Sequence, residues 1–250
     1  MIGAFILRIF MRQLQFLMSC SMIWAKKQFT GSSLIDLGYR DYIAARFLLN
    51  NQFIIQGLTL ASTAIEKYLK ALIVFNLKGK ERYNYHFDNL EMLKNILERN
   101  YYDVTTKFDP VFLNILEKAF KIRYYDKLEE PIRIGFYLNQ FIGELDNTIH
   151  DLETLVMKMQ NDREFHTPYG RAIKNNDRHL YENNFVLTNQ DKKAFMEKPD
   201  TAFSVYIQTG SSSHRENTVV GRGIINKYEG RLSVFKDPFE PDWFVGSAEQ

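Results

Sequence analysis

Cysteine, proline and glycine are scarce in this chain of 250 residues, and each scarcity excludes something. The single cysteine, Cys20, can form neither an intramolecular disulfide nor a cysteine-based zinc site, so a cytoplasmic location is expected. Only 6 prolines and 13 glycines argue against a long disordered linker. The formal net charge of +2 is far from the strongly basic balance that indicates nucleic-acid binding from charge alone, although it leaves room for a local basic face.

The histidines do not indicate a metal site. There are five, none in HExxH spacing, at positions 86, 150, 166, 179 and 214. Dispersed histidines are usually structural or lie at the surface, so no metal and no cofactor are expected. Apolar residues make up 45% and charged residues 25%, which is typical of a soluble globular protein, and the aromatic share of 14% predicts a bulky core.

Residues 1–29 lack the uninterrupted apolar run of a membrane-spanning helix. The longest clean stretch is Ile2–Leu7, and Arg8 and Arg12 follow it, whereas a spanning helix needs about 20 mostly apolar residues. A secretory signal carries its positive charge before the apolar stretch rather than inside it. Three interpretations stay open: an upstream extension that precedes an internal start, an amphipathic helix that contacts a membrane or a partner, or an unusual signal. The fold is expected to begin near residue 30.

Five helices with short connections are predicted between residues 30 and 160. GSS at 31–33 is an N-cap signal for the first helix, which is expected to end at the pair Asn50 and Asn51. Asp109 followed by Pro110 is a start signal for the fourth helix. The second, third and fifth are expected over 53–76, 90–100 and 131–159. This pattern predicts a mainly α protein built as an up-and-down helical bundle.

Apolar stripes define the predicted buried face of each helix, at about 100° per residue. In the first helix the stripe consists of Leu34, Leu37, Ala44, Ala45 and Leu48. In the second it consists of Leu58, Ala61, Ile65, Leu69, Leu72 and Ile73. In the fourth it consists of Phe112, Ile115, Leu116, Ala119 and Ile122.

Charged residues fall on or beside three of these stripes. Asp41 lies on the first, Glu66 borders the second, and Arg123 falls within the fourth. Lys67 is expected to point away from the core, and Lys70 follows Glu66 at the favourable i+4 spacing. Because burying an unpaired charge costs several kcal/mol, Asp41, Glu66 and Arg123 are expected to contact one another or a polar cleft.

The chain changes character after about residue 160. Residues 161–184 are polar and predicted to be a linker. Residues 185–250 are predicted to form a small α/β or β-hairpin tail, with a short helix capped at Thr188 or Asn189 and a tight hairpin at Glu229-Gly230. Strands are expected at 203–209, 218–228 and 231–235.

Four short motifs, in this order, resemble the HEPN domain family (higher eukaryotes and prokaryotes nucleotide-binding). They are RDYIAARFLL at 40–49, ASTAIEKYLKALI at 61–73, His86 followed by Leu90, and IRYYD at 122–126. The match covers about 32–160. The resemblance implies a HEPN-like bundle over 30–160, a homodimer, and a setting in bacterial toxin–antitoxin pairs or anti-phage defence.

The nuclease motif of that family is missing here. Many HEPN proteins are metal-independent RNases that carry Arg, four to six residues and then His on a late helix. Arg123 is instead followed by YYDKLEEP, so the resemblance is to the non-nuclease branch, for which binding of nucleotides or nucleic acid has been suggested. The expected function is a module that binds a nucleotide, an RNA or a cognate protein partner.

Two other functions stay open. One is a divergent, metal-independent HEPN ribonuclease, for which Glu66, His86 and Arg123 are weak catalytic candidates. The other is a structural interaction protein that contacts a membrane through residues 1–29.

Seven residues are candidates for ligand binding. Lys70, His86 and Arg123 can bind phosphate oxygens by charge-assisted hydrogen bonds. Basic residues interleaved with tyrosines over 78–86 suit single-stranded nucleic acid. The full set is Asp41, Glu66, Lys70, Lys80, Arg82, His86 and Arg123. The alternatives are a structural Arg123–carboxylate network that fixes helix register, and a plain solvated loop.

Overall fold

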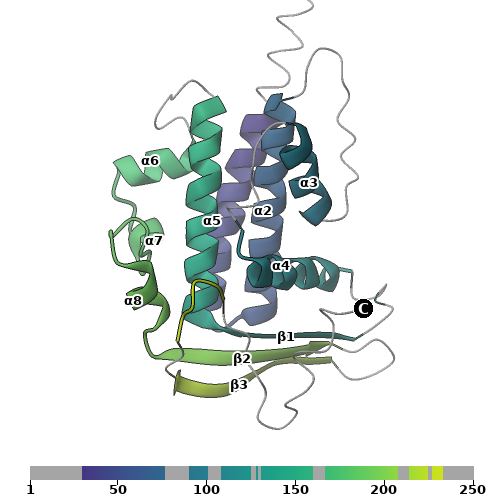
Figure 1. Cartoon of the computed structure of the whole chain (residues 1–250), viewed down its shortest axis with the longest axis vertical. Helices are drawn as coiled ribbons and strands as arrows, with labels where there is room; N and C mark the ends of the chain where they lie inside the picture. The colour runs from purple at the N-terminus through teal and green to yellow at the C-terminus, as the bar shows by residue number, and fades with distance from the viewer. Residues whose placement is uncertain are drawn as a thin grey trace, which may run out of the picture.

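The described part of the chain is mainly helical and carries a small antiparallel sheet, which confirms the expected mainly α class (Figure 1). In this computed structural model the long helices run side by side, and the sheet lies across one end of them. The structure describes residues 30–76, 90–100, 108–124, 128, 131–159, 167–207, 214–224 and 227–232.

The helices follow the predicted order closely up to residue 122. The first covers residues 30–50. It is followed by α2 (Ile54–Asn76), α3 (Leu90–Asn100), α4 (Pro110–Ile122) and α5 (Leu138–Met159). Three short helices come next: α6 (Pro168–Lys174), α7 (Arg178–Tyr181) and α8 (Lys192–Met196). The strands are β1 (Ile132–Tyr137), β2 (Asp200–Ile207) and β3 (His214–Ile224).

Helix α2 is the central helix of the bundle and contacts α3, α4 and α5. Its predicted apolar stripe is confirmed, because all six positions are buried. Burying a Leu or Ile side chain stabilises a fold by about 1.5–3 kcal/mol. Among the residues of α2 only Gln56 is exposed, so this helix holds the elements around it in place.

The buried face of the helix over residues 30–50 is rotated by about one position from the prediction. Tyr42 and Ala45 are fully buried, whereas Leu37, expected inside, is 47% exposed. The helix carries two apolar stripes, and the interior takes the one that includes Tyr42 and Arg46, whose polar ends find partners there. The expected N-cap at 31–33 is also wrong, because these residues already lie within the helix.

The predicted long helix over 131–159 is two elements. Its first part is strand β1, and α5 begins only at Leu138. Ile132, Ile134 and Phe136 are buried and pack against the bundle, and Gly135 between the last two is buried as well. Ile132 and Phe136 are also four residues apart, so their spacing fits a helix equally well, which explains the error.

Strand β2 joins the C-terminal part of the chain to the bundle. The sheet order is β1-β2-β3, and both pairs are antiparallel, with Phe136 opposite Phe203. On β2, Asp200 Oδ2 also accepts a hydrogen bond of 2.6 Å from the backbone N of Asn139. Asp200 thereby satisfies a free N–H in the first turn of α5.

The chain after residue 160 differs from the prediction in three further places. Within the expected linker 161–184 the structure has α6 and α7. Helix α8 is capped by Asp191 rather than by Thr188 or Asn189. The hairpin expected at Glu229-Gly230 is wrong, since the pairing partner of β3 is β2 and residues 227–232 form no strand.

None of the described helices is both long enough and apolar enough to cross a membrane. Residues 1–29, to which membrane contact was assigned, lie outside the described part of the chain.

Replacing Asp109 tests how the start of α4 is held. Its Oδ1 accepts hydrogen bonds from Val111 N and Phe112 N, and its Oδ2 accepts one of 2.6 Å from Leu232 N. Asp109→Ala removes all three acceptor contacts, so we expect the free energy of unfolding to fall by about 1–2 kcal/mol. Urea denaturation of the two proteins measures the change.

Asp109→Asn is the matched variant. Its amide oxygen still caps α4, but its amide NH2 group cannot accept from Leu232 N. We therefore expect a loss between zero and that of the alanine variant. Equal losses in both variants would show that the cap contributes nothing.

Candidate functional site

The structure brings together three of the predicted ligand-binding residues. Glu66, Lys70 and Arg123 meet between α2 and the C-terminal end of α4, which confirms the expected contact between Arg123 and Glu66. Asp41 does not join them; it pairs with Lys67 on α2 at 2.5 Å. The expectation that Lys67 points away from the core is therefore wrong, because this long side chain reaches back to the neighbouring helix. Lys80, Arg82 and His86 lie outside the described residues.

We call Thr63, Glu66, Lys70 and Arg123 the α2–α4 cluster. Glu66 bridges its two cations: Oε1 lies 2.5 Å from Lys70 Nζ, and Oε2 lies 3.1 Å from Arg123 Nη1. Arg123 Nη1 also donates to Thr63 Oγ1 at 3.3 Å. Helix α2 supplies three of the four side chains because positions 63, 66 and 70 are three and four residues apart and so share a face.

Arg123 lies among aromatic rings. Its guanidinium carbon is 3.9 Å from the centre of the Phe120 ring and 5.6 Å from that of Tyr124. The Phe120 ring is buried, whereas Tyr124 is 48% exposed. The Arg123 side chain itself is 20% exposed, so the cluster lies at the edge of the core, within reach of solvent. Stacking on these rings fixes the plane of the guanidinium and stabilises the Arg123 side chain in this position.

One donor of this cluster has no acceptor. Arg123 Nε is buried, and no hydrogen-bond partner for it exists among the described residues. A buried donor without a partner costs about 1–3 kcal/mol. The α2–α4 cluster is thus a cationic group that is only partly satisfied by the protein.

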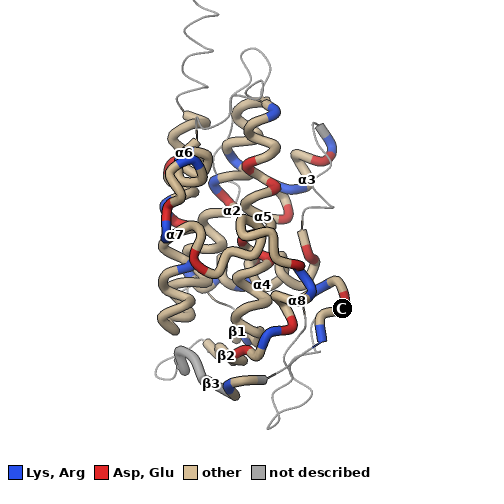
Figure 2. The backbone as a smooth tube through the Cα atoms, turned by 90° about the vertical axis from the view of Figure 1, so that its left-hand side faces the viewer, with Lys and Arg blue, Asp and Glu red and all other residues tan. Residues whose placement is uncertain are grey.

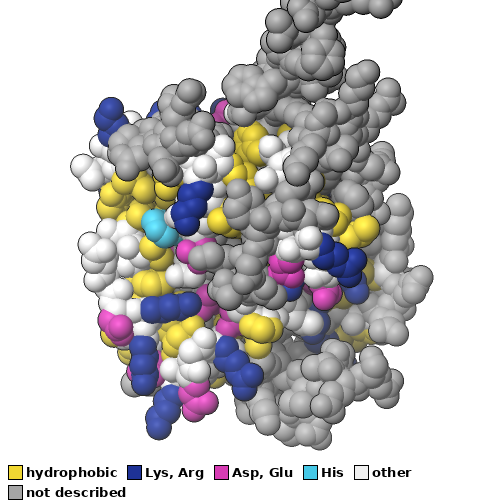
Figure 3. Space-filling model, turned by 45° about the horizontal axis from the view of Figure 1, so that its top comes forward, with side chains coloured by type: hydrophobic (Ala, Val, Ile, Leu, Met, Phe, Trp, Pro, Cys, Tyr) yellow, Lys and Arg dark blue, Asp and Glu magenta, His cyan; other side chains and the backbone are white. Residues whose placement is uncertain are grey.

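The charges of the described elements are otherwise mixed. Figure 2 shows basic and acidic positions interspersed along the described elements, and Figure 3 shows side chains of both signs interspersed with apolar ones on the face it presents. This agrees with the net charge of +2. Local geometry, and not an extended basic face, therefore distinguishes the α2–α4 cluster.

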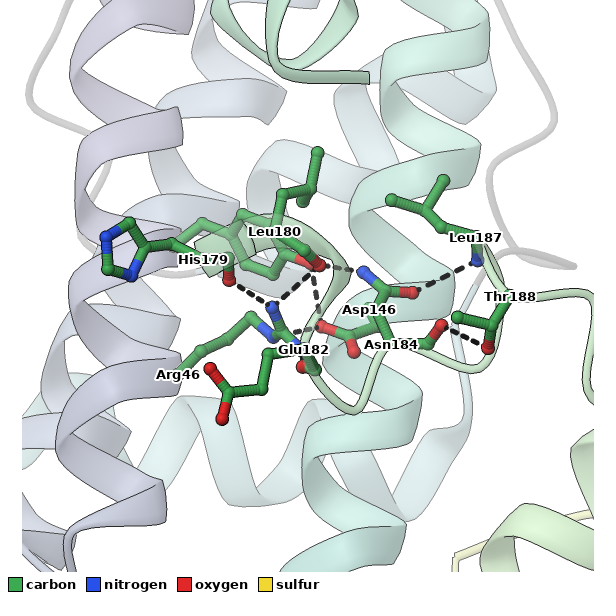
Figure 4. Close-up of polar contacts among 9 residues, drawn as sticks. Arg46, Asp146, His179, Leu180, Glu182, Asn184, Leu187 and Thr188 are labelled. Atoms are coloured by element: carbon green, nitrogen blue, oxygen red, sulfur yellow. Dashed lines mark hydrogen bonds and ion pairs between the residues drawn. The ribbon is translucent and has the colours of Figure 1, made fainter. Parts of the chain in front are cut away.

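A second polar network, which the sequence did not indicate, lies deep in the protein (Figure 4). Arg46 and Asp146 form an ion pair of 2.9 Å, and their side chains are 3% and 0% exposed. Tyr42 donates to the same Asp146 oxygen at 2.7 Å, and Asn184 donates to the Tyr42 hydroxyl at 3.3 Å. We call Tyr42, Arg46, Asp146 and Asn184 the buried network.

Arg46 connects this network to the backbone near α7. Its Nη1 donates to the carbonyls of His179 and Leu180, and its Nη2 donates to that of Glu182. The guanidinium thus ties the helix over residues 30–50, α5 and the turn after α7 to one another. The only signal in the sequence was the pair Tyr42 and Arg46 at i,i+4 spacing, and the rotated apolar stripe hid it.

Burial sets the protonation of the acids in the core. It raises the pKa of Asp146 to about 6, although Arg46 and the Tyr42 hydroxyl oppose the shift. Burial also raises the pKa of Glu153, on α5, to about 7, while the hydroxyl of Tyr68 opposes it with a 2.5 Å hydrogen bond. The buried network is closed to solvent, so we assign it to structure and not to binding.

Among the described residues no group of three His, Cys, Asp or Glu side chains is placed to hold a metal ion. Comparison with known proteins finds no matching family model, no matching curated protein and no matching solved structure. The α2–α4 cluster is therefore evaluated from its own geometry.

Breaking the buried ion pair is expected to be costly. Arg46→Met leaves the Asp146 carboxylate uncompensated and three backbone carbonyls without their donor, so we expect a loss of about 3–5 kcal/mol in the free energy of unfolding. Guanidinium denaturation followed by far-UV circular dichroism measures it.

Arg171→Met is the matched control. Arg171 and Asp36 form an Arg–Asp pair of 4.0 Å whose side chains are 55% and 52% exposed, so its loss is expected to cost less than about 1 kcal/mol. Similar losses in the two variants would contradict the assignment of a special role to the Arg46–Asp146 pair.

Glu153 makes stability depend on pH. Its pKa rises from 4.5 to about 7 on folding, so the folded state holds the proton more tightly than the unfolded state. The contribution of Glu153 is fully present below pH 4.5 and is lost as pH rises to about 7, by about 3 kcal/mol in all. We expect Glu153→Gln to gain stability relative to the wild type by about this amount between pH 4 and pH 8.

The measurement is urea denaturation of both proteins across this pH range. Asp146 and Asp200, whose pKa values are raised to about 6, act equally in both and cancel in the difference. Glu229→Gln, at an exposed position, is the control and should show no such change. A difference between the wild type and Glu153→Gln that does not vary with pH would refute the assignment.

Proposed function

We propose that this protein is a HEPN-like domain protein of the non-nuclease branch that binds the phosphate of a nucleotide or RNA at the α2–α4 cluster. The observation that carries the proposal is that Lys70 and Arg123 meet at the edge of the core with a donor of Arg123 left without a partner.

The chemistry of the cluster favours a phosphate ligand. A guanidinium presents several N–H donors in a fixed plane, which matches paired phosphate oxygens, and an ammonium group adds a second charge beside it. Contact with Phe120 holds the guanidinium of Arg123 in position before a ligand arrives. Such a site needs little reorganisation on binding, which favours affinity.

The aromatic ring beside the cluster favours a ligand with a base. Tyr124 directly follows Arg123, and nearly half of it is exposed. Stacking of a base on an aromatic side chain contributes about 1–3 kcal/mol. A nucleotide or a single-stranded RNA supplies both a phosphate for Arg123 and a base for Tyr124.

The helical architecture supports the HEPN-like part of the proposal. The motifs that carry the resemblance lie on adjacent helices: Glu66 and Lys70 belong to ASTAIEKYLKALI, and Arg123 belongs to IRYYD. The proposal also includes a homodimer, which is usual in the HEPN family, and a role in bacterial defence.

Binding of a fluorescein-labelled single-stranded RNA, followed by fluorescence anisotropy, tests the proposal. We expect the wild type to bind and Arg123→Ala to weaken binding at least about tenfold, since a hydrogen bond to a charged group contributes about 1.5–3 kcal/mol. Arg123→Lys keeps the charge but loses the planar fork, so we expect an intermediate affinity.

Arg178→Ala is the control for net charge, because the Arg178 side chain is 86% exposed and lies on α7. It should bind like the wild type. An equal loss in Arg178→Ala and Arg123→Ala would contradict a specific site. Cleavage of the RNA in the presence of EDTA would contradict the non-nuclease assignment, so RNA integrity is checked on a gel.

A further inference from the structure

We infer that residues 1–24 fold back onto the helix over residues 30–50 and cover an apolar stripe that this helix leaves outside the core. The contact joins two parts of the same chain and is independent of the phosphate site at the α2–α4 cluster. Three features support it: the exposure of the stripe, the polar and apolar pattern of residues 1–24, and the matched spacing of the two.

The helix over residues 30–50 leaves one of its two apolar stripes outside. The interior takes the stripe with Tyr42, whereas Leu37 on the other is 47% exposed and Phe47 beside it is 61% exposed. Among the described residues, three of the five exposed large apolar side chains lie between positions 37 and 53. An apolar patch of this kind marks a contact surface. We call Leu37, Asp41, Ala44 and Leu48 the outer stripe.

The segment directly before this helix has the sequence pattern of a second amphipathic helix. At about 100° per residue, one narrow face collects polar side chains, namely Arg8, Arg12, Gln15 and Ser19. The opposite face includes Ile2, Ile6, Phe10, Gln13, Leu17 and Trp24. Of these six residues only Gln13 is polar. A helix with so narrow a polar face buries the remainder against another apolar surface.

The two patterns have the same spacing. On the segment, intervals of four, three and four residues separate Ile6, Phe10, Gln13 and Leu17. On the helix over residues 30–50, the same intervals, read in the opposite direction, separate Leu48, Ala44, Asp41 and Leu37. Because two antiparallel helices run past each other in opposite directions, all four pairs come to the same level together.

The paired side chains complement one another. Phe10 comes to the level of Ala44, so a bulky side chain lies against a small one, as close packing requires. The polar residue of each pattern also falls at one level, where Gln13 meets Asp41. An amide NH2 group donates to a carboxylate, and Asp41 already accepts from Lys67 at 2.5 Å. The contact therefore covers the polar residues with partners for them.

The connection has a suitable length. Residues 25–29 separate the segment from the helix, and helix–helix connections usually have about 2–8 residues. A reversal within 25–29 places residue 24 beside residue 30 and Leu17 beside Leu37, which is the register that the spacing requires. A helix over residues 1–24 is about 36 Å long, more than the distance of about 17 Å along the axis from Leu37 to Leu48.

Attachment through so short a connection favours this partner over others. A short tether gives the segment an effective concentration of about a millimolar at the neighbouring helix. A membrane or a second copy of the chain has to compete with a surface that is always present at this concentration.

Disulfide formation in the full-length chain tests the contact, because Cys20, its single cysteine, lies in the segment. In the proposed register Cys20 comes within one position of Ser33, which is half-buried. We therefore expect Ser33→Cys to form an intramolecular disulfide under mild oxidation. Non-reducing gels and intact mass spectrometry measure the rate and distinguish this bond from a linked dimer.

Ser32→Cys is the matched control. Ser32 is exposed and points about 100° away around the helix, while its distance from Cys20 along the chain is almost the same. We expect its disulfide to form at least about tenfold more slowly, because the two thiols do not face each other. Equal rates would overturn the inference, and so would a linked dimer of Ser33→Cys, which would make a second copy the occupant.

Fluorescence of Trp24 gives a second test. The chain has two tryptophans, so Trp243→Phe leaves Trp24 as the only reporter. In this background Leu37→Asp places a charge on the outer stripe at an exposed position, and far-UV circular dichroism checks that the bundle is intact. We expect the emission of Trp24 to shift to longer wavelength, because the segment leaves the stripe and Trp24 enters water.

Met92→Asp is the control for the added charge, since Met92 on α3 is also 47% exposed. It should leave the emission of Trp24 unchanged. The same emission in Leu37→Asp and its parent would contradict the contact. Emission that shifts only when phosphatidylcholine and phosphatidylglycerol vesicles are added would assign the segment to a membrane and overturn the inference. If Leu37→Asp is unfolded, the two disulfide rates decide.

Discussion

The ion pair between Arg46 and Asp146 is the interaction on which the arrangement of this fold depends. Removing two charges from water is costly, and a buried pair is retained only when hydrogen bonds satisfy its remaining groups. Here three backbone carbonyls near α7 accept from the terminal nitrogens of Arg46, and the Tyr42 hydroxyl donates to Asp146 Oδ1, while Asp146 Oδ2 has no hydrogen-bond partner among the described residues. Because these partners come from separate parts of the chain, only one relative position of the helices satisfies them all. We therefore expect the ion pair to favour this packing over others that an apolar interface alone would allow.

The α2–α4 cluster has similar residues but is more exposed to solvent. In the buried network, Arg46 has acceptors for both of its terminal nitrogens and no contact with solvent. In the cluster, Arg123 keeps a donor without an acceptor and is partly open to solvent. Arg46 Nε and Asp146 Oδ2 in the buried network also lack a hydrogen-bond partner within the described part of the chain, so the two sets differ in exposure and not in satisfaction. This difference in exposure is the reason why we assign Arg46 to structure and propose Arg123 for binding.

The sequence predicted α2, α3 and α4 well because their apolar spacing is regular and Pro110 marks a start. It also predicted the contact of Arg123 with Glu66, since two charges on inner faces must be neutralised. It failed for β1, whose partner β2 lies more than sixty residues later, and for the face of the first helix, where two stripes compete. The role of Arg46 could not be predicted, because its acceptors are backbone carbonyls and these leave no signal in the sequence.

The hydrogen bond from Asn139 N to Asp200 has a consequence for the order in which the protein can be made. Helix α5 leaves the ribosome well before the strand that supplies the acceptor for its first turn, and β1 likewise precedes its pairing partner. During synthesis, the start of α5 and the edge of β1 must wait with open backbone groups until β2 emerges. A chain stopped after the bundle would therefore carry an exposed strand edge, the kind of surface that chaperones recognise and that pairs with other chains.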